Sequence, residues 1–364
     1  MYMKTIIVTL VAIFLFVILG SFLLGYVKKS IDGTLTSQPI ATLPSPTPLP
    51  TPTQTKDTFL FVPYWALSNS QVISVDQQTL IYFGIEATKA GLSMGESGAL
   101  NLSTFVRSRG QKRSLLAIRM INNEENFDIL KDKDAQEKII EDSILLAKEN
   151  DFSGIVLNLE LSALPFESLV EQITFFNREF FLESKKSDLS YYITAYGDTY
   201  YRVRPFNFTA LSRDSDGIFI MAYDLHKARG NPGPNFPLRG KDEYGYDIES
   251  MLGDFSNAVD AQKITVVFGM YGYDWEVDDD GSTVSEGEAL SLKEAESRLI
   301  DGCLYEFCNW ERDQDAGEVK VEYKDASGRN HLVWFEDLES VKRKESYLNS
   351  RGIKSFAYWA YSYF

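Results

Sequence analysis

Eight short apolar segments recur along the chain after Thr58, and their number and spacing restrict the fold more than any other feature. They are near-continuous apolar runs, which are typical of strands that are covered on both faces, as in a parallel sheet. The segments are residues 59–65, 80–87, 114–120, 152–159, 189–196, 217–223, 264–270 and 355–361.

Amphipathic segments separate these runs. Residues 134–149 place Ile140 and Ile144 at helical spacing, and residues 166–181 and 246–261 behave similarly. Strands that alternate with helices form a parallel sheet. Eight such units predict an α/β fold, the (β/α)8 TIM-type barrel, which typically needs about 250 residues. A doubly wound open sheet is the alternative, but no glycine-rich phosphate loop follows the first strand.

The stretch before the last apolar run is too long for a single helix. We expect a small inserted subdomain at about residues 276–336, with a hairpin of residues 319–323 and 331–335 around the turn at 326–328. A barrel with this insert would occupy residues 58–364.

Two cysteines, Cys303 and Cys308, lie in the insert. In an oxidising compartment they could form a small disulfide loop, and two free thiols are the alternative. The two histidines, His226 and His331, and these cysteines do not have the spacing of a zinc site. We therefore expect no metal and no cofactor.

The amino-terminal residues differ in composition from the rest. Residues 5–27 carry no charge and would form a helix of roughly 34 Å, enough for a hydrocarbon core of about 30 Å. We expect residues 1–29 to be a transmembrane signal anchor. A cleaved signal peptide is the alternative, because Gly20, Ser21 and Gly25 are small.

Residues 30–57 are rich in Pro, Thr and Ser and predict an extended linker. A spacer between a membrane helix and a globular domain indicates a single-pass protein of the cell membrane with its barrel on the extracytoplasmic side. The chain has 36 basic and 52 acidic residues and a net charge of −16. Such a surface repels phosphate backbones, which argues against a nucleic-acid partner.

Active-site groups of such barrels sit at the carboxyl ends of the strands. Asn158 and Glu160 end the fourth run and are two residues apart, so both should point into the barrel mouth. Three later runs end in aromatic and acidic residues. These are Met221-Ala222-Tyr223-Asp224 for the sixth, Tyr271-Gly272-Tyr273-Asp274-Trp275 for the seventh, and Trp359 for the eighth.

These strand ends resemble glycoside hydrolase family 18, which includes chitinases, endo-β-N-acetylglucosaminidases and spore-cortex peptidoglycan hydrolases. The motifs of the family are D-G-x-D-x-D-x-E on the fourth strand, then M-x-Y-D, Y-G-Y-D-W and a Trp on the last strand. The segment from His331 to Asp337, followed by Ser340, resembles the H-x-V-W-F-x-D-x-x-S stretch of the spore-cortex branch. The resemblance spans roughly residues 59–363.

The resemblance implies retaining, substrate-assisted hydrolysis of β-1,4 bonds at N-acetylglucosamine in peptidoglycan or chitin-like polymers. Glu160 would protonate the glycosidic oxygen, while the 2-acetamido oxygen of the sugar attacks the anomeric carbon. Tyr223 would hydrogen-bond that acetamide oxygen. The further substrate-binding residues would be Asp224, Trp359, Tyr273, Trp275 and Met221.

The chain departs from the family motif at three carboxylates. Ser153, Val156 and Asn158 stand where the fourth-strand motif has aspartates. Asn158 would accept a hydrogen bond from the acetamide N–H but lacks the full charge. We estimate a loss of about 1–3 kcal/mol, or roughly 10- to 100-fold in rate. The S-x-G-G signature of the third strand is replaced by residues 117–120, which include Arg119.

Two other functions remain as alternatives. The first is a weakened or inactive carbohydrate-binding barrel, lectin-like, at the cell envelope. The second is a scaffold that presents the acidic barrel to a protein. Among the remaining aromatic residues, we expect Trp65, Trp310 and Trp334 to be packing residues. Arg119 would either reach into the barrel mouth or pair with a carboxylate.

Overall fold

The computed structural model describes residues 57–67, 72–305 and 308–364. The expected transmembrane anchor at 1–29, and the expected linker up to Lys56, lie outside these residues. In the ranges that are described, no helix is both long enough and apolar enough to cross a membrane.

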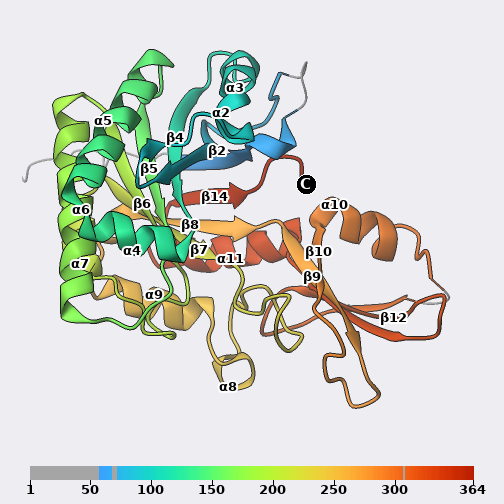
Figure 1. Cartoon of the computed structure of the whole chain (residues 1–364). Helices are drawn as coiled ribbons and strands as arrows, with labels where there is room; N and C mark the ends of the chain where they lie inside the picture. Colours follow the sequence, from blue (N-terminus) through green and yellow to red (C-terminus); the bar gives the residue numbers. More distant parts are fainter. Residues whose placement is uncertain (1–56, 68–71, 306–307) are drawn as a thin grey trace, which may run out of the picture. The chain divides into compact units, whose positions relative to one another are not determined.

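Eight parallel strands close into a barrel (Figure 1). β1 pairs with β2 on one side and with β14 on the other, so the sheet has no free edge and the open-sheet alternative is wrong. The eight apolar runs of the sequence correspond to these strands. They are β1 (Asp57–Pro63), β2 (Thr79–Thr88), β4 (Arg113–Met120), β5 (Gly154–Leu159), β6 (Ser190–Tyr196), β7 (Gly217–Ala222), β8 (Ile264–Gly269) and β14 (Ser355–Trp359). The two-residue strand β3 (Gly91–Leu92) pairs antiparallel with the end of β2.

Helices cover the outside of the barrel. The three predicted helices are present as α5 (Lys133–Glu149), α6 (Glu167–Lys186) and α9 (Ile248–Ser256). α5 begins where the Asp132 side chain accepts a hydrogen bond from the backbone N–H of Ala135, a favourable N-cap. The others are α2 (Ser97–Leu100), α3 (Leu102–Ser108), α4 (Asn123–Lys131), α7 (Phe208–Arg213), α8 (Lys241–Tyr244) and α11 (Leu338–Ser350), with 3-10 turns η1 (Tyr64–Ala66) and η2 (Ala261–Lys263).

The barrel interior is a separate apolar cluster, distinct from the layer between strands and helices. Phe59, Phe61 and Phe219 pack edge to face within it. Val156 is completely buried in the same cluster. A carboxylate at this position would be surrounded by hydrocarbon, which is costly for an unpaired charge. Val156 therefore fits this apolar interior better than an unpaired aspartate would.

A second, antiparallel sheet follows β8 and lies beside the barrel (Figure 1). It includes the predicted hairpin. Its strands, in spatial order, are β10 (Glu288–Ser291), β9 (Tyr271–Val277), β13 (Asn330–Phe335), β12 (Val319–Lys324) and β11 (Cys308–Arg312).

The second sheet starts earlier than the insert expected from the sequence. β8 ends at Gly269 and β9 begins at Tyr271, so Tyr273 and Trp275 belong to the second sheet. Their placement at the end of the seventh barrel strand is therefore wrong. Gly272 permits the new pairing, since a Cβ there would lie 1.8 Å from the carbonyl oxygen of Trp334.

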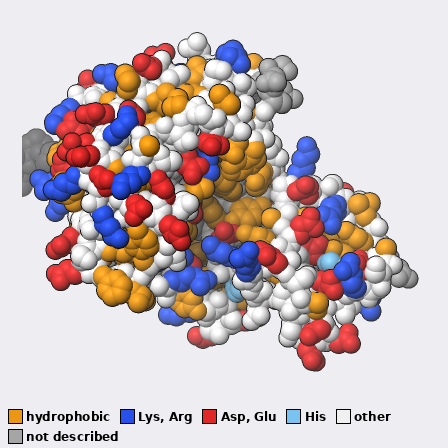
Figure 2. Space-filling view, viewed as in Figure 1, with side chains coloured by type: hydrophobic (Ala, Val, Ile, Leu, Met, Phe, Trp, Pro, Cys, Tyr) orange, Lys and Arg blue, Asp and Glu red, His pale blue; other side chains and the backbone are white. Residues whose placement is uncertain are grey.

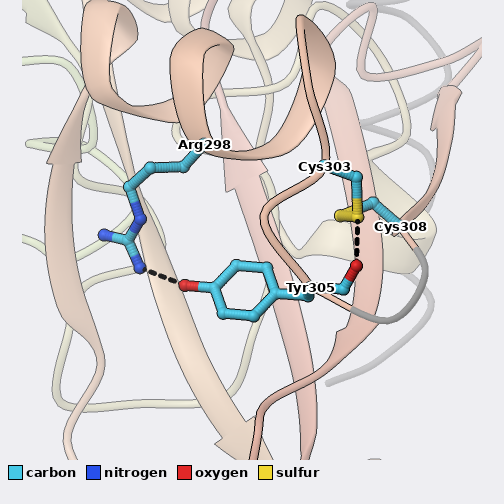
Figure 3. The surroundings of a disulfide bond; sticks show 4 residues. All are labelled: Arg298, Cys303, Tyr305 and Cys308. Atoms are coloured by element: carbon cyan, nitrogen blue, oxygen red, sulfur yellow. Dashed lines mark hydrogen bonds between the residues drawn. A yellow bond between two sulfur atoms is a disulfide. The ribbon is translucent and has the colours of Figure 1, made fainter.

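Cys303 and Cys308 form a disulfide between β11 and the loop that follows the short helical segment α10–η3 (Leu292–Ala295 and Glu296–Ile300). The free-thiol alternative is wrong in this structure. Figure 3 shows Tyr305 beside the disulfide, with its hydroxyl 2.8 Å from Arg298 Nη2, which donates to it. The Tyr305 ring stacks on Tyr323 at a centroid distance of 4.1 Å, which ties this loop to the sheet.

Candidate active site

A cleft of about 270 Å³ opens at the carboxyl ends of the barrel strands. In Figure 2, hydrophobic side chains gather in a hollow between the barrel and the second sheet. Six of the eight residues predicted for the site line this cleft. They are Asn158, Glu160, Met221, Tyr223, Asp224 and Trp359.

The backbone of Glu160 is fixed where β5 ends. Its N–H donates to the carbonyl oxygen of Met120 at 2.8 Å, and its own carbonyl accepts from Asn126 Nδ2 at 2.7 Å. Asn126 is buried on α4. The carboxyl group thus projects into the cleft from a backbone that is held on both sides.

The two oxygens of the Glu160 carboxyl accept from different side chains. Asn158 Nδ2 donates to Oε1 at 3.0 Å, and the Tyr196 hydroxyl donates to Oε2 at 3.0 Å. Asn158 is itself held, since its Oδ1 accepts from Thr194 Oγ1 at 3.0 Å. Burial, together with the charge of Glu160, raises the pKa of Tyr196 well above its usual range. Tyr196 therefore stays protonated at any physiological pH and remains a donor.

Tyr223 follows β7 and offers a free hydroxyl to the cleft. No hydrogen bond of this hydroxyl is found within the part of the chain that the structure describes. Burial raises the pKa of Tyr223 far above the ordinary phenol value, and the charges of Glu160 and Asp224 raise it further. The hydroxyl is thus a neutral donor, close to Glu160, that a ligand oxygen can use.

Asp224 is held by two tyrosines. Its Oδ1 accepts from the Tyr271 hydroxyl and, at 2.8 Å, from the Tyr273 hydroxyl. Its backbone has a positive φ of 61°, a conformation that Asp adopts more readily than most residues. The backbone N–H then donates to Asn235 Oδ1 at 2.7 Å. Tyr273 therefore acts on the site through Asp224, and it is not among the residues that line the cleft.

A buried ionic cluster supports the loop that follows Asp224. Glu318 accepts from the backbone N–H groups of Asn235 and Phe236, at 2.6 and 2.8 Å. Lys344 on α11 donates to Glu318 and to Glu336, at 2.7 and 2.6 Å, and all three side chains are completely buried. Burial alone would lower the pKa of Lys344, but the two carboxylates raise it, so the lysine stays charged.

Aromatic side chains form the floor and one wall of the cleft. The Trp359 ring lies between Phe83 and Tyr223, with centroid distances of 4.8 and 6.5 Å. Trp65 contacts Trp359 edge to face at 6.2 Å and is 49% exposed. The prediction that Trp65 is a packing residue is wrong, because its ring faces the cleft.

Trp275 does not reach the cleft. It is completely buried in a small cluster with Ala316 and Trp334, and its Nε1 donates to the carbonyl oxygen of Ala228 at 3.2 Å. Tyr271, Tyr273 and Trp275 share one face of β9, but Trp275 lies two residues beyond Tyr273 along the strand, outside the cleft. Its expected role as a lining residue is therefore not supported, whereas Trp334 is a packing residue as predicted.

The sequence profile described as "Glycosyl hydrolases family 18" matches residues 33–363. The chain belongs to this family. Among its relatives, YdhD of Bacillus subtilis, which is named as a sporulation-specific glycosylase, is 28% identical over 157 residues, or 43% of this chain and 34% of YdhD. Di-N-acetylchitobiase of Mus musculus is 23% identical over 241 residues, 59% of this chain and 62% of that enzyme. The chain thus spans less than two thirds of the length of either relative.

Solved structures share the fold. The spore cortex-lytic enzyme SleL of Bacillus cereus superposes with a TM-score of 0.66 at 20% identity, covering 85% of this chain and 71% of SleL. At this level of identity the likeness concerns the fold, and it agrees with the closed eight-stranded barrel described above.

Among the cleft residues that were not predicted from the sequence, three carry polar groups close to Glu160 or Asp224. Tyr196 is the last residue of β6, so the rule that active groups follow strand ends could have found it. Lys227 lies three residues after Asp224, and its Nζ is 3.7 Å from Asp224 Oδ2. Tyr271 lines the cleft through its hydroxyl bond to Asp224. Lys227 and Tyr271 follow strands β7 and β8, and only the loop geometry brings their side chains into the cleft.

Proposed function

We propose that this member of family 18 hydrolyses β-1,4 glycosidic bonds at N-acetylglucosamine, with retention and with assistance from the substrate. The observation that carries the proposal is the position of Glu160 in an aromatic-floored cleft that Tyr223 also lines. Stacking on Trp359 suits the apolar face of a sugar ring, and Met221 and Asp224 would shape the subsite around it.

The proton that is transferred would reside on Glu160 Oε2. An amide nitrogen cannot accept a proton, so Asn158 Nδ2 can only donate to Oε1. A phenol can both donate and accept, so the hydroxyl of Tyr196 can turn to accept from a protonated Oε2. Tyr196 would thereby hold Glu160 in either protonation state.

In the bond-breaking step, the proton of Glu160 moves to the glycosidic oxygen as the bond from that oxygen to the anomeric carbon breaks. The carbonyl oxygen of the 2-acetamido group forms the new bond to the anomeric carbon. Tyr223 would donate to this oxygen and orient it, and Asn158 Oδ1 would accept from the acetamide N–H. Water, deprotonated by Glu160, then displaces the acetamide oxygen and restores the starting configuration.

The polymer would be peptidoglycan or a chitin-like chain, since relatives are named for chitobiose and for the spore cortex. We place the barrel outside the cell, tethered by residues 1–29. The uncharged sequence of residues 5–27 and the disulfide Cys303–Cys308 support this location, because disulfides persist in oxidising compartments.

The test is turnover by the full chain on chito-oligosaccharides and purified peptidoglycan. Glu160→Gln should abolish product release while leaving affinity for the oligosaccharide within about twofold, because Gln cannot give up a proton. The matched control is Glu137→Gln, an exposed residue of α5 on the outer surface. Unchanged turnover in Glu160→Gln would refute the acid assignment.

A carbohydrate-binding barrel without turnover is the second candidate, and one observation favours it. Asn158 carries no charge, and its carbonyl already accepts from Thr194 at 3.0 Å, so it stabilises a positive intermediate poorly. Saturable binding of the same oligosaccharides without any product would establish that the barrel binds carbohydrate without cleaving it.

A further inference from the structure

Arg119 enters the cleft from the end of β4, next to Asn158. The strand register pairs Arg119 with Asn158 on β5, and paired side chains of parallel strands point to the same side. Ala117 and Val156, the pair two residues earlier, both lie in the barrel interior. Arg119 therefore points into the barrel mouth and lines the cleft with Glu160.

The guanidinium of Arg119 is held by aromatic rings instead of hydrogen bonds. It lies over the rings of Phe83 and Tyr64, at 5.1 and 5.8 Å from their centroids. Glu86 Oε2 is 4.0 Å from its Nη1, beyond hydrogen-bond distance. The buried Nε has no hydrogen-bond partner in the described ranges. The side chain is only 11% exposed, and it lines the cleft.

Arg312 and Arg204, which are also shielded, each donate to a carboxylate, although Arg204 Nε likewise has no partner among the described residues. Arg312 donates to both carboxylate oxygens of Asp337, at 2.8 and 2.6 Å, and Arg204 donates to Asp198. Buried donors are rarely left without acceptors, since an unmade bond to a charged group is costly. We therefore expect a bound ligand to supply the hydrogen-bond acceptor of Arg119.

Two cations line the cleft beside two carboxylates. Lys227 lines the same cleft, 44% exposed, which gives the site two cations in a chain of net charge −16. The cleft carboxylates Glu160 and Asp224 have tyrosine or asparagine donors of their own. They do not need Arg119 as a hydrogen-bond donor.

We propose that Arg119 selects a glycan that carries a carboxylate close to the scissile bond. A guanidinium binds a carboxylate through two parallel hydrogen bonds, which gives both affinity and orientation. Peptidoglycan offers such a group as the lactyl carboxylate of N-acetylmuramic acid or as the terminal carboxylate of its stem peptide, whereas chitin is neutral. The inference rests on the proposed function and narrows the substrate to the acidic polymer.

Calorimetry on the full chain with four oligosaccharides of equal length tests this inference. The first contains N-acetylglucosamine and N-acetylmuramic acid with a free lactyl group, and the second has this group as its methyl ester. The third carries a dipeptide on the lactyl group, which moves the carboxylate to the peptide end. The fourth is chitotetraose. The free acid or the dipeptide form should bind about 10- to 100-fold more tightly than the two neutral ligands.

The variants separate recognition from support of the fold. Arg119→Met keeps the stem over Phe83 and should remove the preference while leaving the affinity for chitotetraose within about twofold. Arg119→Lys keeps the positive charge but cannot form the two parallel hydrogen bonds of a guanidinium. It should therefore retain part of the preference for the acidic ligands. Arg213→Gln, an exposed arginine at the end of α7, is the matched control.

Each outcome decides a separate point. A wild-type protein that binds acidic and neutral ligands equally overturns the inference, even if it cleaves both. If Arg119→Met loses affinity equally for all four ligands, Arg119 does not recognise the carboxylate of the ligand. That result also overturns the inference. A carboxylate preference without turnover keeps the inference and refutes the proposed hydrolysis. The preference should also weaken as salt rises from 0.05 to 0.5 M, roughly, because charge pairs are screened.

Discussion

Asn158 donates a hydrogen bond from Nδ2 to Glu160 Oε1 across 3.0 Å, and this bond joins the two residues on which the proposed catalysis depends. Two carboxylates at this distance would share one proton, which keeps the pair singly charged. An amide removes that coupling. The geometry of the site is thus preserved while its capacity to stabilise positive charge is reduced.

We predict that Asn158→Asp raises kcat by roughly 10- to 100-fold, about 1–3 kcal/mol of transition-state stabilisation. The new carboxylate would still accept from Thr194, and it would share a proton with Glu160. Steady-state kinetics on chito-oligosaccharides at several pH values measure the effect. Asn257→Asp, exposed after the end of α9, is the control. A folded Asn158→Asp protein with unchanged kcat would show that this residue does not limit turnover.

Tyr196→Phe should lower kcat about 10- to 100-fold with little change in KM. The hydroxyl holds Oε2 of Glu160 at 3.0 Å, and hydrogen bonds to charged groups contribute about 1.5–3 kcal/mol. Tyr201→Phe is the matched control, because Tyr201 is 49% exposed and stacks on Tyr246 away from the cleft. If KM rises and kcat stays constant, Tyr196 serves substrate binding instead of proton transfer.

The sequence predicted the barrel well because its strands are covered on both faces. An apolar run of seven or eight residues leaves few other arrangements, and every one of the eight runs became a barrel strand. The pattern failed after β8, where Tyr271 to Trp275 continue the apolar run without a break. The barrel strand ends there because β9 pairs with β13 of the second sheet instead of with a barrel strand. The order of apolar residues does not show this change of partner.

The site was predicted where a side chain follows a strand, as for Glu160 and Tyr223. Residues of the site were missed where two segments that are distant in sequence meet in the fold. Trp65 reaches the cleft because β1 and β14 are neighbours, which places its ring against Trp359. Glu318 supports Asn235 over 83 positions of sequence. The first contact follows from closure of the barrel and the second from the packing of the second sheet against the loop after β7, and no local pattern contains either.

Glu336 should make the stability of the fold depend on pH. Burial raises the pKa of Glu336 to about 8, although Lys344 opposes this shift. The unfolded chain titrates this group near 4.5, so between about pH 4.5 and 8 the folded state alone binds the proton. The contribution of this protonation to the free energy of unfolding is fully present below about pH 4.5. It is lost as the pH rises to about 8, by at most about 1.4 kcal/mol per pH unit.

Urea denaturation of the wild-type chain and of Glu336→Gln, from pH 5 to pH 8, measures this contribution. Gln does not titrate, so the difference between the two proteins should grow with pH in favour of the variant. Glu339→Gln on the exposed face of α11 is the control and should parallel the wild type. Parallel curves for Glu336→Gln would show that Glu336 has an ordinary pKa in the fold.

Trp65→Ala should weaken the binding of oligosaccharides on the order of 10-fold without destabilising the fold. The ring is 49% exposed, so its removal leaves no internal cavity, while a bound sugar would cover its free face. Covering that face contributes about 1–2 kcal/mol at 25 cal/mol per Å².

Trp310→Ala is the matched control for Trp65→Ala. Trp310 is 52% exposed on β11 of the second sheet and does not line the cleft. Calorimetric titration with chitotetraose should therefore separate the two variants, and their melting temperatures should stay within a few degrees of the wild type. Equal affinities in both variants would mean that sugars bind Trp359 without reaching Trp65, and would confine the binding site to the barrel mouth.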